Sequence, residues 1–143
     1  MDQKKLKKIN YELVDTFLSA GKLSLELRRI GLKKEIKDDQ TPVTNGDLEV
    51  DKILTEKITN LTPEIPIVSE ESSKNKLNTK LKNFWLIDPI DGTYDYINNG
   101  DEFTLNAGLI INNKAIMGII NIPAKDRLFY SYGKDLSFEF SDK

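Results

Sequence analysis

The spacing of hydrophobic residues predicts two helices in the first half of the chain. Hydrophobic positions recur every three or four residues from about residue 3 to residue 30, which is the spacing of one helix face, and Gly31 is suited to end this helix. A second stripe with the same spacing ends before Pro63. Thr44 precedes that stripe and Asp47 follows three residues later, the pattern of a capping box, so we expect the second helix to begin at Thr44.

Short hydrophobic runs bounded by turn residues predict a sheet in the rest of the chain. Asn112 and Asn113 separate two of these runs and fit a tight hairpin turn, because Asn tolerates left-handed backbone. Gly118 within a run suggests a bulge or a close backbone approach, and the polar segment 72–82 is typical of a mobile loop. Two helices followed by strands predict an α+β fold, with the helices packed on an antiparallel sheet. The expected strands are residues 65–69, 84–87, 103–111, 114–122, 127–132 and 136–140, with a short helix within residues 94–102.

Composition and charge limit the class of protein. The chain has 143 residues, the size of one domain, with 38% hydrophobic residues, 31% charged residues and a net charge of −2. This balance describes an ordinary protein surface and gives no support for a nucleic-acid partner, so we interpret the lysines at positions 4, 5, 7 and 8 as a solvated helix face. No hydrophobic run is long enough for a membrane span, and the first residues lack the hydrophobic core of a signal peptide. We therefore expect a cytoplasmic protein, with a peripheral position at the inner membrane as the alternative.

The chain contains neither cysteine nor histidine. Disulfides, zinc–thiolate sites and thiol nucleophiles are thereby excluded. Because histidine is the commonest general base, any acid–base chemistry must use carboxylates, hydroxyls, lysines or metal-bound water.

Two carboxylates follow a predicted buried strand. The hydrophobic run Phe84–Ile87 stops at Asp88, and Asp91 follows three residues later. Carboxylates suit Mg²⁺, whose usual site combines one or two of them with a substrate phosphate. The backbone N–H groups of Gly92 and Thr93 could receive that phosphate at a helix N-terminus. The alternative interpretation is an ordinary Asp-Pro turn followed by an Asp-Gly turn.

Asp47 and Glu70 extend this acidic set. Glu70 follows another hydrophobic run, residues 65–69. Two metal ions about 3.5–4 Å apart can hold the attacking and leaving oxygens of a phosphoryl group, so Asp88 could bridge them while Glu70 holds one and Asp91 the other. A metal-bound water would then be the nucleophile, without a histidine. For Asp47 the simpler alternative is a capping acid favoured by the helix dipole, and one carboxylate can serve both roles.

Three motifs in this order resemble those of the inositol monophosphatase superfamily, which comprises Mg²⁺-dependent, lithium-sensitive phosphatases. The motifs are Thr41–Thr44 with Asp47, Glu70–Ser72 and Trp85–Thr93. Segments 37–44, 61–66 and 102–106 are similar to one branch, the bacterial 3'(2'),5'-bisphosphate nucleotidases of the CysQ type. The resemblance implies removal of the 3'-phosphate of 3'-phosphoadenosine 5'-phosphate to give AMP, which clears a by-product of sulfate assimilation.

The resemblance also implies a fold, a cofactor and a set of site residues. Residues 1–143 would form the N-terminal metal-binding half of the sugar-phosphatase fold, an αβαβα sandwich, and would hold two or more Mg²⁺ ions. Thr93 would orient the attacking water with the help of Asp47. Glu70 would serve catalysis as well as metal binding, and Gly92 and Thr93 would bind the substrate phosphate. The implied metal ligands are Glu70, Asp88, Asp91 and the backbone carbonyl of Ile90.

The chain departs from this branch in two places. Tyr94-Asp95-Tyr96 stands where the branch has Lys-Glu-Phe, and the Trp-Asp motif of the family's second half, which supplies a further metal ligand, is absent. We therefore expect that the C-terminal domain is absent and that the activity of the chain alone is impaired. The alternatives are an inositol monophosphatase or sugar bisphosphatase and, from another class, a non-catalytic metal-binding or assembly module. Such a module would pair with a second copy, as a homodimer, or with the missing C-terminal half.

Overall fold

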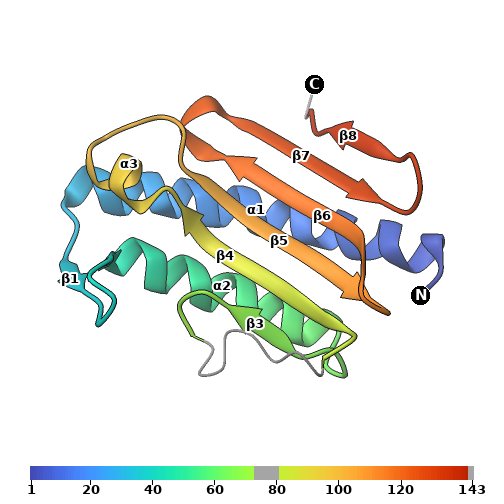
Figure 1. Ribbon diagram of the computed structural model, residues 1–143. Coiled ribbons are helices and arrows are strands. Elements are labelled where there is room, and N and C mark those ends of the chain that lie inside the picture. Colours follow the sequence, from blue (N-terminus) through green and yellow to red (C-terminus); the bar gives the residue numbers. More distant parts are fainter. Residues whose placement is uncertain (73–80, 142–143) are drawn as a thin grey trace.

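The structure is a computed structural model that describes residues 1–72 and 81–141 (Figure 1). Within these residues, two long helices pack against one face of a six-stranded sheet. The helices are α1 (Gln3–Ile30), α2 (Asn45–Leu61) and the short α3 (Thr93–Ile97), with a 3₁₀ turn at Pro123–Lys125. A hairpin of β1 (Lys34–Ile36) and β2 (Pro42–Thr44) connects the two long helices. The sheet consists of β3 (Ile67–Ser69), β4 (Phe84–Asp91), β5 (Thr104–Ile111), β6 (Lys114–Ile122), β7 (Arg127–Tyr132) and β8 (Ser137–Glu139).

Both predicted long helices are confirmed. The C-cap of α1 is Gly31, with a φ angle of 112°. The capping box of α2 is complete, because the Thr44 hydroxyl accepts from the Asp47 N–H and the Asp47 carboxylate accepts from the Thr44 N–H. At the other end of α2, the Thr62 hydroxyl accepts a hydrogen bond of 2.9 Å from the buried indole N–H of Trp85, which fixes the helix to β4 in the core. None of the described helices is long and apolar enough to cross a membrane.

The sheet has the order β3-β4-β5-β6-β7-β8, and each neighbouring pair is antiparallel except the parallel pair β3–β4. The α+β class is confirmed, but the expectation of a purely antiparallel sheet is wrong at this pair. Residues 70–83 join β3 to β4, a connection long enough for a parallel return, and most of the predicted loop 72–82 lies outside the described residues. Because the strands are parallel and Ser69 pairs with Ile87, the residues that follow β3 lie alongside the last part of β4, which continues past the predicted end at Ile87 to Asp91.

The hairpin between β5 and β6 turns at Asn112 and Asn113, whose φ angles are 50° and 65°, so the predicted turn is confirmed. The predicted bulge or close approach at Gly118 is wrong. Gly118 pairs with Gly108, and the register shift lies nearer the turn, at residues 109–110. A Cβ at Gly118 would make ordinary van der Waals contacts, 3.7 Å from the Ala107 carbonyl oxygen and 3.8 Å from Ser131 Oγ, so no close approach requires glycine here.

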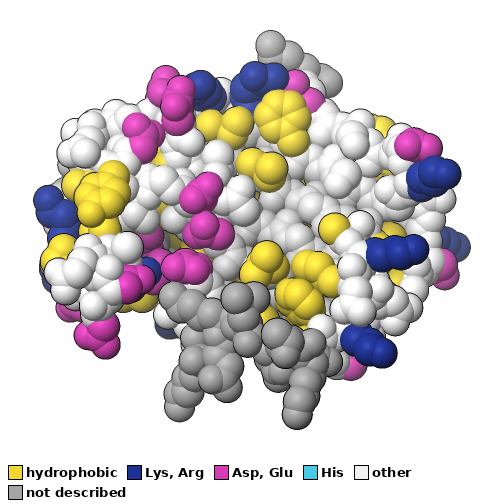
Figure 2. Space-filling model, viewed as in Figure 1, with side chains coloured by type: hydrophobic (Ala, Val, Ile, Leu, Met, Phe, Trp, Pro, Cys, Tyr) yellow, Lys and Arg dark blue, Asp and Glu magenta, His cyan; other side chains and the backbone are white. Residues whose placement is uncertain are grey.

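The sheet face opposite α1 and α2 carries hydrophobic and acidic side chains together (Figure 2). Asp88, Asn106, Ile120 and Phe129 are successive register partners across β4 to β7, so their side chains share this outer face. Leu86, two residues before Asp88 on the same face, is 49% exposed, and Ile120 is 44% exposed. The predicted metal ligand Asp88 therefore stands beside an exposed hydrophobic surface.

Candidate metal and phosphate site

The predicted site residues come together beside the C-terminal end of β3 and the last residues of β4. A pocket of about 280 Å³ lies there, between the β1–β2 hairpin and the turn after β4. Its lining contains every predicted site residue except Asp47, which contacts Thr93 from α2. The lining residues are Lys37, Thr41, Pro42, Glu70, Glu71, Asp88, Ile90, Asp91, Gly92, Thr93 and Tyr94.

Asp47 is completely buried at the start of α2 and uses both carboxylate oxygens within the protein. Its Oδ2 accepts hydrogen bonds from the backbone N–H and the hydroxyl of Thr44, at 2.8 and 2.6 Å. Its Oδ1 accepts a hydrogen bond of 3.0 Å from the hydroxyl of Thr93. Asp47 therefore caps the helix and also holds Thr93, so the capping interpretation is confirmed and remains compatible with a role at the site.

Asp88 is half-buried within β4, on the outer face of the sheet, and has an unsatisfied oxygen. Its Oδ1 is buried and has no hydrogen-bond partner in the described part of the chain. Burial and four acidic neighbours raise the pKa of Asp88 to about 6. These neighbours are Asp91, Glu70, Glu71 and Asp47. A carboxylate without a partner among other acids is the environment that a hard cation stabilises, so this donor set fits Mg²⁺.

Lys37, which follows β1, is the cationic side chain of the pocket lining. Its Nζ lies 3.6 Å from Glu70 Oε1 and 3.7 Å from Glu71 Oε1. Among residues 1–72 and 81–141, no three acidic side chains are already grouped closely enough to hold a metal ion. Glu70 lies beside Lys37 instead.

The turn after β4 is shaped by Gly92, whose φ angle of 87° is favoured by glycine. Thr93 follows it and begins α3, and the Thr93 Oγ1 lies 3.4 Å from the carbonyl oxygen of Ile90. No side chain caps this end of α3 in the part of the chain that the structure describes. Its first N–H groups are therefore available to an anion next to Asp88 and Asp91.

Some supporting residues were not predicted from the sequence. Asn106 on β5 donates a hydrogen bond of 3.4 Å to the backbone carbonyl of Asp88. Asp51 on α2 is buried and accepts a hydrogen bond from the hydroxyl of Ser69, the last residue of β3. Lys37 lies within the matched segment 37–44, but no role was assigned to it. Asn106 stands out in the sequence as a polar residue within a hydrophobic run, whereas Lys37 and Asp51 carry no such signal.

The profile of the inositol monophosphatase family matches residues 2–138. The chain belongs to this family. The resemblance based on the motifs around Asp47, Glu70 and Asp88 is thereby confirmed.

Sequence relatives of this inositol monophosphatase family member include proteins named 3'(2'),5'-bisphosphate nucleotidase CysQ. The protein of Haemophilus influenzae is 40% identical over 99 residues, which cover 68% of this chain and 37% of that protein. The protein of Buchnera aphidicola is 36% identical over 97 residues, which cover 67% of this chain and 37% of that protein. The matched region thus spans little more than a third of these curated relatives.

Solved structures of inositol monophosphatase-like proteins share the fold. The extragenic suppressor protein SuhB of Bartonella henselae has a TM-score of 0.81 at 20% identity, over 95% of this chain and 53% of that chain. The IMPase of Thermotoga maritima has a TM-score of 0.80 at 21% identity, over 96% of this chain and 52% of that chain. An IMPase/NADP phosphatase solved with Mg²⁺ and phosphate has a TM-score of 0.81 at 18% identity, over 94% and 51%. This chain therefore has the fold of about half of each of these proteins.

Proposed function

We propose that this chain supplies the metal-binding part of a phosphomonoesterase site that uses two or more Mg²⁺ ions. The observation that carries the proposal is Asp88, whose buried Oδ1 has no partner within the described residues and whose neighbours are acids. The proposed metal ligands are Glu70, Asp88, Asp91 and the backbone carbonyl of Ile90. Bound Mg²⁺ supplies positive charge for the phosphoryl oxygens and lowers the pKa of water towards neutrality.

Thr93 is the group that we propose to orient the attacking water. Its hydroxyl hydrogen is donated to Asp47 Oδ1, so the Thr93 oxygen offers only lone pairs to a water. A water that donates to Thr93 keeps its own lone pairs free for the phosphorus atom. The N–H groups of Gly92 and Thr93 would hold the phosphate, and Glu70 would act in catalysis as well as in metal binding.

The proposed substrate of the complete enzyme is 3'-phosphoadenosine 5'-phosphate, with AMP and phosphate as products, which places the enzyme in sulfur metabolism. The name and 40% identity of the Haemophilus influenzae relative support this choice. An inositol phosphate or sugar bisphosphate is the second candidate, favoured by the structural likeness to an IMPase. Competition between 3'-phosphoadenosine 5'-phosphate and inositol 1-phosphate in one assay of a full-length relative discriminates them. Faster phosphate release from the inositol phosphate would contradict the assignment of 3'-phosphoadenosine 5'-phosphate as the substrate.

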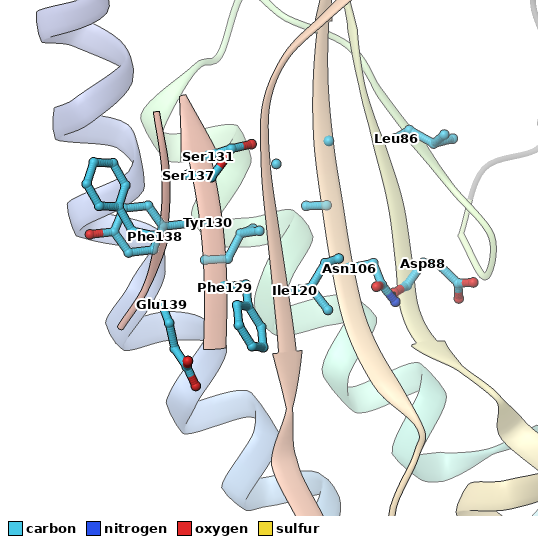
Figure 3. A pocket seen from close by; sticks show the side chains of 14 residues that line it. Leu86, Asp88, Asn106, Ile120, Phe129, Tyr130, Ser131, Ser137, Phe138 and Glu139 are labelled. Atoms are coloured by element: carbon cyan, nitrogen blue, oxygen red, sulfur yellow. The ribbon is translucent and has the colours of Figure 1, made fainter. Parts of the chain in front are cut away.

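We propose that the second half of the complete family chain packs on the outer face of the sheet. A cavity of about 650 Å³ crosses this face from Asp88 and Asn106, over Gly118, to Phe129 (Figure 3). The solved relatives are almost twice as long as this chain, which matches 53% of one of them. A cover on this face would also exclude water from Asp88. We therefore propose that residues 1–143 are an N-terminal metal-binding domain with little activity alone.

A phosphatase assay tests this proposal. Residues 1–143 are mixed with the separately produced C-terminal half of the Haemophilus influenzae relative, with 3'-phosphoadenosine 5'-phosphate and Mg²⁺. We expect negligible phosphate release from either half, recovery on mixing, and loss of the recovery in Asp88→Asn. Turnover by residues 1–143 alone at about 1 s⁻¹ or faster would contradict the impairment. A stable complex without any turnover would support the assembly module instead.

A further inference from the structure

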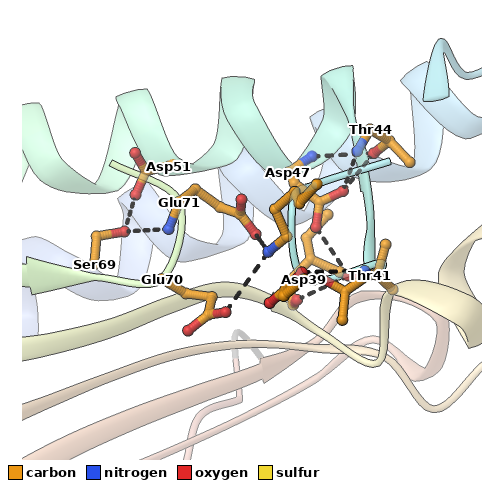
Figure 4. A network of polar contacts seen from close by, with 11 residues as sticks. Asp39, Thr41, Thr44, Asp47, Asp51, Ser69, Glu70 and Glu71 are labelled. Atoms are coloured by element: carbon orange, nitrogen blue, oxygen red, sulfur yellow. Dashed lines mark hydrogen bonds and ion pairs between the residues drawn. The ribbon is translucent and has the colours of Figure 1, made fainter. Parts of the chain in front are cut away.

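The first turns of α2 carry two buried acids four positions apart, and each accepts a hydrogen bond from a hydroxyl at the site edge (Figure 4). Asp47 accepts from Thr93, which follows β4. Asp51 accepts from Ser69, which ends β3. Asp51 is 5% exposed and has no ion pair among the described residues, and Ser69 is fully buried. A buried carboxylate is unfavourable unless hydrogen bonds stabilise it, so the contact with Ser69 is the feature that needs an explanation.

The contact continues from Ser69 to the acidic segment that follows it. Ser69 Oγ accepts a hydrogen bond of 3.4 Å from the backbone N–H of Glu71. On the side of β4, the backbone N–H of Glu70 donates a hydrogen bond of 3.0 Å to the carbonyl of Ile87. A hydroxyl that donates to a carboxylate is a stronger acceptor, so Asp51 strengthens the hydrogen bond from the Glu71 N–H to Ser69 Oγ. The backbone at Glu70 is thereby fixed between α2 and β4.

We propose that Asp51 is a positioning residue, which acts through the Ser69 hydroxyl to hold Glu70 where it can bind a metal ion. This inference rests on the proposed function, because it takes Glu70 as a metal ligand. One helix then fixes both sides of the pocket, through Asp47 for Thr93 and through Asp51 for Glu70. Partners behind metal ligands commonly change metal affinity by about 10- to 100-fold.

Four variants of the full chain test the role of Asp51. They are Asp51→Ala, Asp51→Asn, Ser69→Ala and the double variant of Asp51→Ala with Ser69→Ala. Thr55→Ala is the matched control on the next turn of α2, because the Thr55 hydroxyl donates to the carbonyls of Asp51, at 2.8 Å, and Lys52, at 3.3 Å, within the helix. The affinity for Mn²⁺ is measured from the electron paramagnetic resonance signal of the free ion.

We expect Asp51→Ala and Ser69→Ala each to weaken Mn²⁺ binding about tenfold, and the double variant to weaken it no further, because both act through one contact. Asp51→Asn should retain part of the affinity, since its carbonyl can still accept from Ser69. Thr55→Ala should leave the affinity unchanged. Unchanged affinity in Asp51→Ala, with only a lower melting temperature, would show a purely structural role and overturn the inference.

Hydrogen exchange at the Glu71 amide gives a second readout that needs no metal. We expect exchange to be about tenfold faster in Asp51→Ala and unchanged in Thr55→Ala. If the unmodified chain binds no Mn²⁺, the proposed function fails and the metal-binding part of this inference fails with it, while the exchange rates still decide whether Asp51 holds the backbone. Equal exchange rates in Asp51→Ala and the unmodified chain would overturn that part.

Discussion

The Thr93 hydroxyl donates a hydrogen bond of 3.0 Å to Asp47 Oδ1, although the two residues lie 46 positions apart in the chain. This contact joins the start of α2 to the turn after β4. Because the other oxygen of Asp47 caps α2 through Thr44, the stability of the helix and the orientation of Thr93 depend on one carboxylate.

Asp47→Ala should destabilise the fold as well as release Thr93. The substitution removes the helix cap and leaves buried hydroxyl and N–H groups without an acceptor, so we expect the free energy of unfolding to fall by about 2–3 kcal/mol. Urea denaturation measures this change. Glu49→Ala, at an exposed acid in the same part of α2, is the control and should change the value by less than about 0.5 kcal/mol. A similarly small change for Asp47→Ala would contradict the double role.

Asp88→Asn should stabilise the metal-free protein at neutral pH. The pKa of Asp88 is about 6 in the folded state, against an ordinary value of 3.8, so the folded state binds more protons than the unfolded state between about pH 4 and 6. Stability therefore falls as pH rises through this window. In EDTA at pH 7 we expect Asp88→Asn to raise the free energy of unfolding by about 1–3 kcal/mol. Below about pH 3.5 the gain should vanish, and a gain of equal size at both pH values would count against this explanation.

Lys37→Gln should increase the affinity of the pocket for a divalent metal. The lysine lies beside Glu70 and Glu71 and competes with a metal ion for their charge. We expect Mn²⁺ to bind about three- to tenfold tighter in low salt, and the difference to shrink at about 0.5 M salt. Lys34→Gln is the control, because Lys34 lies on the same hairpin and has no ion pair among the described residues. Weaker binding in Lys37→Gln would show that the lysine supports the site.

Substitutions on the outer face should reduce association of the chain without unfolding it. Leu86 and Ile120 are 49% and 44% exposed, so lysine at both positions removes little packing. We expect residues 1–143 to associate with rising concentration in sedimentation velocity, and the double variant of Leu86→Lys with Ile120→Lys to remain monomeric. Ile36→Lys, on the β1–β2 hairpin, should associate like the unmodified chain. A monomeric unmodified chain at all concentrations would refute an exposed docking face.

The local structure could be predicted from the sequence because its causes are local. The capping box of Thr44 and Asp47 and the Asn112-Asn113 turn each depend on neighbouring residues. The direction of β3 against β4 could not be predicted, since the hydrophobic run Ile67–Ser69 has no pattern that distinguishes parallel from antiparallel pairing. That direction depends on the whole connection between the two strands.

The candidate site could be predicted in part, because some of its residues are close together in the sequence. Asp88 and Asp91 are three positions apart, and their spacing indicated a shared site. Lys37 and Asp51 could not be placed from the sequence, because their contacts join segments that only the folded chain brings together. A lysine in a charged segment and an acid in an amphipathic helix ordinarily face solvent, whereas here one lies between two glutamates and the other is buried.

A divalent-metal site organised by Asp88 is tested most directly by titrating Mn²⁺ into the full chain and recording the free ion by electron paramagnetic resonance. We expect saturable binding to the unmodified chain and at least about tenfold weaker binding to Asp88→Asn. Asp126→Asn, at an exposed acid outside the pocket lining, should bind like the unmodified chain. Equal binding to the unmodified chain and Asp88→Asn would contradict the metal site.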